Sequence, residues 1–192
     1  MISKSALRTI PVTAALLGAA MFSLPASVIA AASQEVSANF MAENAITAEL
    51  KELRGLMSQL DTDADQLHSL TNSRLHWQTH ASRLTTVKDH VNRIGDQLEV
   101  LQTMRLSAAP WQQEAIDSLV PAASQVAGHT TSAIDHLNES SQRLWAPDYI
   151  DHLRAIAALS DHMHGLVDNH LKIIDAQSKI QSLEYNLAER VL

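Results

Sequence analysis

The sequence contains no cysteine and only small numbers of glycine, proline and aromatic residues. Of its 192 residues, five are Gly, five are Pro and 4% are aromatic. Without cysteine the chain forms no disulfide, thiolate metal site, c-type haem attachment or cysteine nucleophile. The few glycines leave no Gly-rich loop or nucleophile elbow of the kind that many active sites need. With 46% hydrophobic residues, this composition favours one all-α domain.

Basic residues are also scarce. The chain has 14 Lys and Arg against 21 Asp and Glu, and its formal net charge is −7. No basic cluster interrupts this acidic balance, so we expect no nucleic-acid partner, because phosphate binding requires a basic face. Histidine is the abundant polar residue, with ten copies. All of them lie between His68 and His170.

The first 32 residues have the three-part plan of a secretory signal peptide. A basic start, an apolar stretch and small residues follow one another, at Lys4 and Arg8, residues 9–24, and Ala30 to Ala32. We predict cleavage after Ala30 or Ala32. An uncleaved anchor is the alternative, but the apolar stretch is short against the ~20 residues of a spanning helix. We therefore predict a periplasmic or secreted protein without stable membrane insertion after cleavage.

The rest of the chain has the apolar periodicity of long helices. The clearest repeat lies in residues 73–104, with steps of three, four and seven that place its apolar residues on one stripe: Trp77, Leu84, Val87, Val91, Ile94, Leu98 and Leu101. After a flexible lead-in at 33–44, we predict a helical domain over 45–192. Its four helices are expected at about 45–71, 73–107, 110–144 and 148–190.

Short connections separate these expected helices. The breaks fall near Asn72, before Pro110 and before Pro147, and proline is well tolerated at the first position of a helix. Pro121 lies inside the third helix and should kink it. Short connections between long helices favour antiparallel neighbours. We predict an elongated, antiparallel, up-down-up-down four-helix bundle with coiled-coil-like packing. A helical hairpin that dimerises, or a three-helix bundle with a fused first helix, is the alternative.

Histidines gather at matching heights in this predicted topology. With turns near residues 72, 109 and 146, His80 shares a layer with His136 and His152. His90 similarly shares a layer with His129, His162 and His164. The heptad phase points His80 and His152 inward. Two layers of imidazole nitrogens would suit Zn, Cu(II) or Ni.

A local pair adds to this hypothesis, because His76 and His80 are four residues apart and can face the same way on a helix. The predicted ligand set is therefore His76, His80, His136, His152, His90, His129 and His162. The alternative interpretation is that these histidines are ordinary residues of the helix interfaces, pairing with Asp or facing water. Di-iron and EF-hand sites are rejected, since no Glu precedes a His by three residues and the acidic run from Asp61 lacks the required Gly and Glu.

The function that these patterns favour is interaction rather than catalysis. We expect an exported, non-enzymatic helical bundle that binds a partner protein, an envelope component or a second copy of itself, because long apolar stripes permit association. We expect no cofactor in this case. The alternative function is binding of a divalent transition metal by the histidine layers. Clustered histidines, which titrate near pH 6.5, also suggest a pH-responsive variant of the first function.

Overall fold

The computed structural model describes residues 26–72 and 76–191. All regular structure in these two ranges is helical, and neither contains a strand. The long helices are α1 (Ala26–Ser69), α2 (Trp77–Met104), α3 (Pro110–Ser140) and α4 (Pro147–Val191), with short 3-10 helices η1 (Leu70–Asn72) and η2 (Arg105–Ser107). Residues 1–35 and 36–192 form separate compact units, and the packing below is that of residues 36–192. The all-α prediction is confirmed.

The helix bounds differ from the sequence prediction mainly at the N-terminal side. Residues 33–44, expected as a flexible lead-in, lie within α1. No Gly or Pro occurs between Pro25 and Gly55, so nothing in that stretch interrupts a helix once it has formed. α1 and α2 are separate helices rather than one fused helix. Residues 1–25 of the predicted signal peptide lie outside the described residues, and residues 26–32 are helical.

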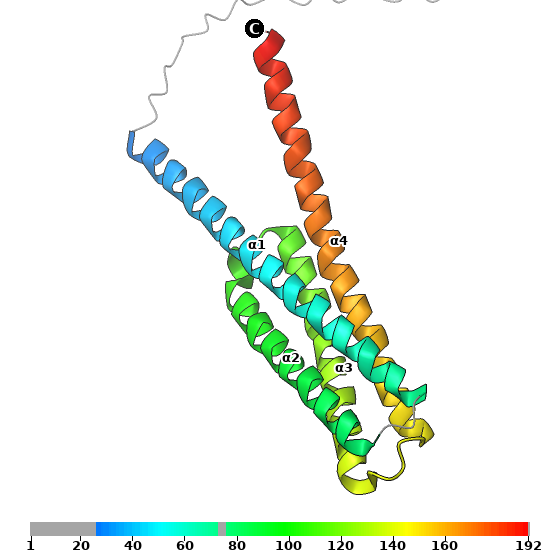
Figure 1. Ribbon diagram of the computed structural model, residues 1–192. Helices are drawn as coiled ribbons and strands as arrows, with labels where there is room; N and C mark the ends of the chain where they lie inside the picture. The colour runs from blue at the N-terminus through cyan, green and yellow to red at the C-terminus, as the bar shows by residue number, and fades with distance from the viewer. Residues whose placement is uncertain (1–25, 73–75, 192) are drawn as a thin grey trace, which may run out of the picture. The chain divides into compact units, whose positions relative to one another are not determined.

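One hydrophobic core is built from all four long helices, which are labelled in Figure 1. The contribution of α1 recurs every three or four residues, as expected for the inner face of an amphipathic helix: Ile46, Leu50, Leu53, Met57, Leu60, Ala64 and Leu67. The predicted stripe of α2 is buried from Leu84 to Leu101, except for the partly buried Val91. Trp77, the first residue of α2, is 40% exposed.

The helices are packed against one another in a bundle-like arrangement. α2 contacts α3 and α3 contacts α4. Polar side chains tie α1 to the other three helices. On α3, Gln112 Nε2 donates to the Glu43 carbonyl at 2.9 Å. On α4, Asp168 lies 3.5 Å from Arg54, and Gln97 of α2 donates to the Glu49 carboxylate.

The prolines mark the helix starts as the sequence predicts. Pro110 and Pro147 are the first residues of α3 and α4, where the missing N–H is not needed for an intrahelical bond. α3 runs through Pro121, which is exposed. At the α2–α3 connection, the Arg105 guanidinium donates two hydrogen bonds to Asp117, at 2.7 and 2.6 Å. This bidentate pair holds η2 against the first turns of α3.

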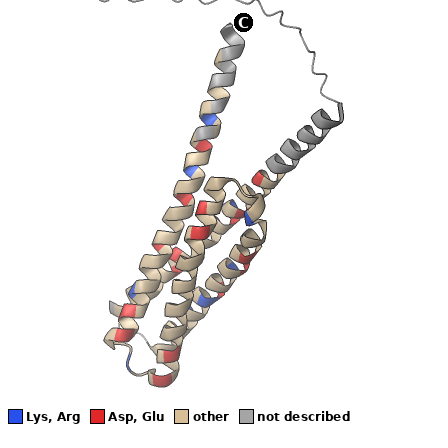
Figure 2. Cartoon of the chain, turned by 180° about the vertical axis from the view of Figure 1, so that it is seen from behind, with Lys and Arg blue, Asp and Glu red and all other residues tan. Residues whose placement is uncertain are grey.

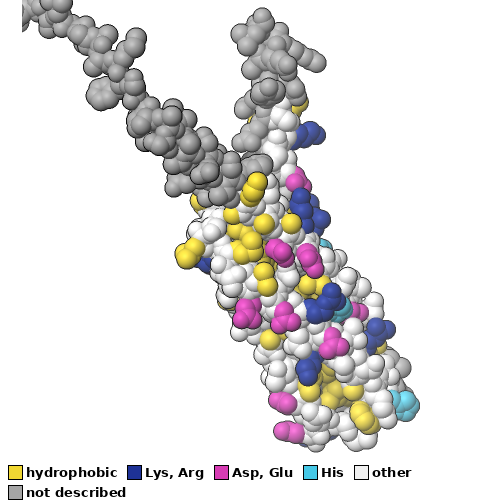
Figure 3. All heavy atoms as spheres, turned by 90° about the vertical axis from the view of Figure 1, so that its left-hand side faces the viewer, with side chains coloured by type: hydrophobic (Ala, Val, Ile, Leu, Met, Phe, Trp, Pro, Cys, Tyr) yellow, Lys and Arg dark blue, Asp and Glu magenta, His cyan; other side chains and the backbone are white. Residues whose placement is uncertain are grey.

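The surface carries both signs of charge along the helices, as Figure 2 shows. On the face shown in Figure 3, apolar side chains form patches between acidic and basic ones. Among the helices that are described, none has an apolar stretch of the length that a membrane crossing requires. These surfaces leave two features for functional interpretation: the histidines between the helices, and an apolar stripe on α4.

Candidate functional site

The structure brings His80, His136 and Tyr149 together where α2 begins, α3 ends and α4 begins. His80 lies in the first turn of α2, Tyr149 is the third residue of α4, and His136 lies in the last two turns of α3. The α3–α4 connection, residues 141–146, is short. It therefore keeps the end of α3 beside the start of α4, so that the Tyr149 ring lies against His80 and also contacts His136.

His80 and Tyr149 form a buried polar pair. The His80 Nδ1 and the Tyr149 hydroxyl are 3.0 Å apart, and the two residues are 1% and 0% exposed. Burial lowers the pKa of His80 and raises the pKa of Tyr149, because each charged form would lose its hydration. Both side chains are therefore neutral near pH 7. The His80 Nε2 is also buried and has no hydrogen-bond partner among the described residues.

His136 contacts the Tyr149 member of this pair. Its ring lies on the Tyr149 ring with a centroid separation of 5.0 Å and an interplanar angle of 24°. The His136 Nε2 lies 3.1 Å from the carbonyl oxygen of Arg143, to which it donates as an N–H. His136 thus holds the α3–α4 connection over Tyr149, and the three rings act together as packing and hydrogen-bonding groups.

Two histidines, His129 and His152, pair with each other between α3 and α4. The Nδ1 atoms of His129 and His152 are 3.0 Å apart, and the rings are tilted by 49° at a centroid distance of 5.3 Å. At this distance one nitrogen donates its proton and the other accepts it. The predicted layers are therefore rearranged. His80 and His136 meet at Tyr149, while His152 pairs with His129, which the sequence analysis places in the other layer.

Two histidines of the second predicted layer contact α1 instead. His90 Nε2 lies 3.0 Å from Asp63 Oδ2, and His164 Nδ1 lies 3.7 Å from Asp61 Oδ2. Burial, followed by the like charge of Asp161 and Asp65, raises the pKa of Asp61, and His164 opposes this shift. The sequence analysis missed both carboxylates as partners, because it compared only the second, third and fourth helices.

Two predicted ligands stand apart from these clusters. His76 and His162 are exposed. His76 precedes the first residue of α2 and has extended backbone angles, with φ −70° and ψ 150°. It therefore does not share a helical face with the buried His80, and the expected pair is absent. Within residues 26–72 and 76–191, no group of three or more His, Cys, Asp or Glu side chains is placed to hold a metal ion.

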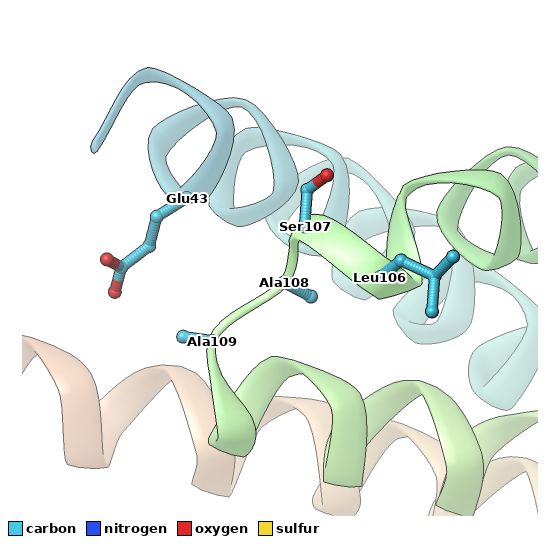
Figure 4. A pocket seen from close by; sticks show the side chains of 5 residues that line it. All are labelled: Glu43, Leu106, Ser107, Ala108 and Ala109. Atoms are coloured by element: carbon cyan, nitrogen blue, oxygen red, sulfur yellow. The ribbon is translucent and has the colours of Figure 1, made fainter. Parts of the chain in front are cut away.

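Neither of two surface cavities brings catalytic groups together. A cavity of about 290 Å³ beside η2 is lined by Glu43, Leu106, Ser107, Ala108 and Ala109. Figure 4 shows the Glu43 carboxylate apart from the side chains of Leu106 and Ser107. A second cavity, of about 380 Å³, lies between α2 and α3 and has a mainly apolar lining that includes Val91, Leu98 and Val120. No histidine lines either cavity.

The last part of α4 carries an exposed apolar stripe, which we call the α4 stripe. Leu171 is the last residue of α4 that is buried among those whose side chains are described, and the C-terminal end of α4 extends past the ends of α2 and α3 (Figure 1). The large members of the stripe are 53–62% exposed: Ile173, Ile180, Leu183 and Leu187. Ala176, between them, is exposed as well.

Comparison with known proteins adds no assignment. No protein family matches the chain, and no curated protein or solved structure matches it either. The functional argument therefore depends on the residues of this chain.

Proposed function

We propose that this chain is an exported, non-enzymatic protein that acts by binding a partner protein, a component of the cell envelope or a second copy of itself. The observation that carries this proposal is the exposed α4 stripe. Five apolar residues at heptad spacing form the kind of helix face that binds another helix or a groove. If α4 only completed the core of its own chain, we would expect the helix to end where the core ends, or its apolar face to become polar there.

Two further parts of the proposal concern the architecture and the destination of the chain. We propose that the four helices form an up-down-up-down bundle. The short α2–α3 and α3–α4 connections and the contacts between these successive helices support it, since such connections favour antiparallel neighbours. The basic, apolar and small-residue segments of residues 1–32 support export through a cleaved signal peptide to the periplasm or the medium.

The test is site-specific photocrosslinking in the cells that make the protein. A photoreactive amino acid replaces Leu183 in the α4 stripe, and the matched control replaces Ser178, which is exposed on the opposite face of the same helix segment. We expect adducts with a partner from position 183, recovered outside the cytoplasm, and few from position 178. Equal yields from the two positions, or adducts confined to the cytoplasm, would contradict the proposal.

A second candidate function is binding of a divalent transition metal. The observation that favours it is the pair of Nδ1 atoms of His129 and His152 at 3.0 Å, since two imidazole nitrogens at such a distance can bind one Zn, Cu(II) or Ni ion. Two protein ligands leave the remaining positions to water, so the affinity would be modest.

Thermal unfolding with added Zn, Cu or Ni tests this second candidate. The expected result is a rise in midpoint that saturates with metal, because a ligand of the folded state stabilises it, by about 2.7 kcal/mol at 100 times the Kd. The variant His152→Gln should lose this response. The control His162→Gln, at an exposed histidine, should keep it. A midpoint that does not respond to metal, or an equal response in both variants, excludes the His129–His152 site.

A further inference from the structure

The α4 stripe has the sequence pattern of one particular kind of interface. Part of the stripe belongs to a series in which every seventh residue of α4 is apolar, and the series begins inside the core: Leu159, Leu166, Ile173, Ile180 and Leu187. The first two are partly buried against the core, whereas the last three are 54–62% exposed. A sustained seven-residue repeat keeps its seam facing a partner only when helices wrap around each other in a left-handed supercoil.

The residue types along the seam indicate the number and direction of strands. In heptad terms, Ile173, Ile180 and Leu187 occupy position a, and Ala176 and Leu183 occupy position d. In parallel coiled coils, β-branched residues at a with leucine at d favour two strands, and Ile173, Ile180 and Leu183 follow this rule. The alanine at one d position allows close approach of the two backbones.

The charges beside the seam support the same arrangement. Lys179 is exposed and occupies position g, and the sequence places Glu184 five residues later, at position e. In a parallel pair in register, position g of one helix lies beside position e of the following heptad in its partner. Because such a dimer has two-fold symmetry, the pair between Lys179 and Glu184 would form twice. An unshifted antiparallel pair would not bring these two positions together.

From the heptad positions and these charges, we infer that the occupant of the α4 stripe is a second copy of this chain, bound as a parallel two-stranded coiled coil over residues 173–187. This inference rests on the proposed function, because it names the partner of the same surface. A coiled coil of two heptads is marginal for free peptides, since helix nucleation is costly. Here the first half of α4 is already helical and buried in the core, so the stripe presents a helix that is already nucleated.

The first test is the mass of the purified chain in sedimentation equilibrium. We expect a monomer–dimer equilibrium and a dimer at high concentration. Lys179→Glu places a second carboxylate beside Glu184 at both of these pairs, so it should weaken dimerisation roughly threefold to tenfold. Combining it with Glu184→Lys restores opposite charges and should restore dimerisation. A monomeric mass at every concentration overturns the inference. Equal dimerisation in the single and double charge variants also overturns it.

The absence of cysteine from the natural chain makes the geometry directly testable. Leu187→Cys should give a disulfide-linked dimer on mild oxidation, because position a faces its own copy in a parallel pair, within the Cα distance of about 4.4–6.8 Å that a disulfide needs. An antiparallel pair centred on Ile180 separates the two copies of residue 187. The control Ser178→Cys should stay monomeric. Failure of Leu187→Cys to crosslink, or equal crosslinking by both variants, overturns the parallel coiled coil.

Photocrosslinking separates this inference from the proposed function. Adducts of twice the chain mass at position 183 support both. Adducts only with other proteins overturn the coiled coil and leave the proposed function supported. An absence of adducts above the Ser178 control contradicts both. An adduct within one chain also contradicts the inference, since the stripe would then be covered by another part of the same chain.

Discussion

His80 shows how one buried side chain links the fold to pH. Its ring lies between helices, and its Nδ1 is 3.0 Å from the Tyr149 hydroxyl. Burial lowers its pKa from the ordinary 6.5. The unfolded chain therefore takes up this proton at a higher pH than the folded chain does. The contribution of His80 to stability is complete above pH 6.5 and is lost as the pH falls from 6.5 towards the lowered pKa.

We predict that the free energy of unfolding falls between pH 7.5 and pH 5, and that His80→Phe reduces the slope. One proton corresponds to at most about 1.4 kcal/mol per pH unit. The measurement is urea unfolding at several pH values, in which slopes rather than absolute stabilities are compared. His162→Gln, at an exposed position, should keep the wild-type slope. A wild-type slope in His80→Phe would show that other groups control the pH dependence.

At the scale of the helix, Gln112 connects the start of α3 to α1. Its side-chain oxygen accepts from the Ala109 N–H at 2.9 Å. Its amide nitrogen donates to the Glu43 carbonyl at 2.9 Å and to the Thr47 hydroxyl at 3.0 Å. The residue is fully buried. One amide thus caps a helix and satisfies polar groups of another.

We therefore predict that Gln112→Leu lowers the free energy of unfolding by about 1–3 kcal/mol, because buried donors and acceptors lose their partners while the volume stays similar. Urea unfolding at pH 7.5 measures this change. The control is Gln125→Leu on the same helix, where the side chain is exposed and an effect within about 0.5 kcal/mol is expected. Equal stability of the two variants would mean that the Gln112 hydrogen bonds do not contribute.

At the scale of the helix, the sequence also explains which helices form and roughly where. Periodicity located all four, and Pro110 and Pro147 are the first residues of α3 and α4. The start of α1 was less predictable, because the alanine- and serine-rich stretch before residue 45 has little apolar periodicity and yet contains no residue that stops a helix. Periodicity reveals an apolar face, so it gives no signal where a helix continues without a regular apolar face.

At the scale of the whole molecule, the same limit of sequence periodicity applies to the α4 stripe. The repeat of Ile173, Ile180 and Leu187 is indistinguishable in sequence from a core repeat, because periodicity shows that a face is apolar and not what covers it. Only the packed structure shows that, among the described side chains of α4, none beyond Leu171 is buried and the large apolar ones are exposed. The proposed coiled coil would bury that face, and dimerisation would then stabilise the fold by mass action.

By itself, the sequence determined the all-helical class, the number of long helices, the buried stripe of α2 and the inward position of His80, because these depend on local propensity and on the 3.6-residue period. Tertiary structure decided the partners of the histidines. His80 pairs with Tyr149, His129 with His152, and His90 with Asp63. Such pairings depend on the rotation and the placement of each helix against its neighbours. A shift of one residue turns a side chain by about 100° on a helix, and the sequence pattern of any single helix does not specify that shift.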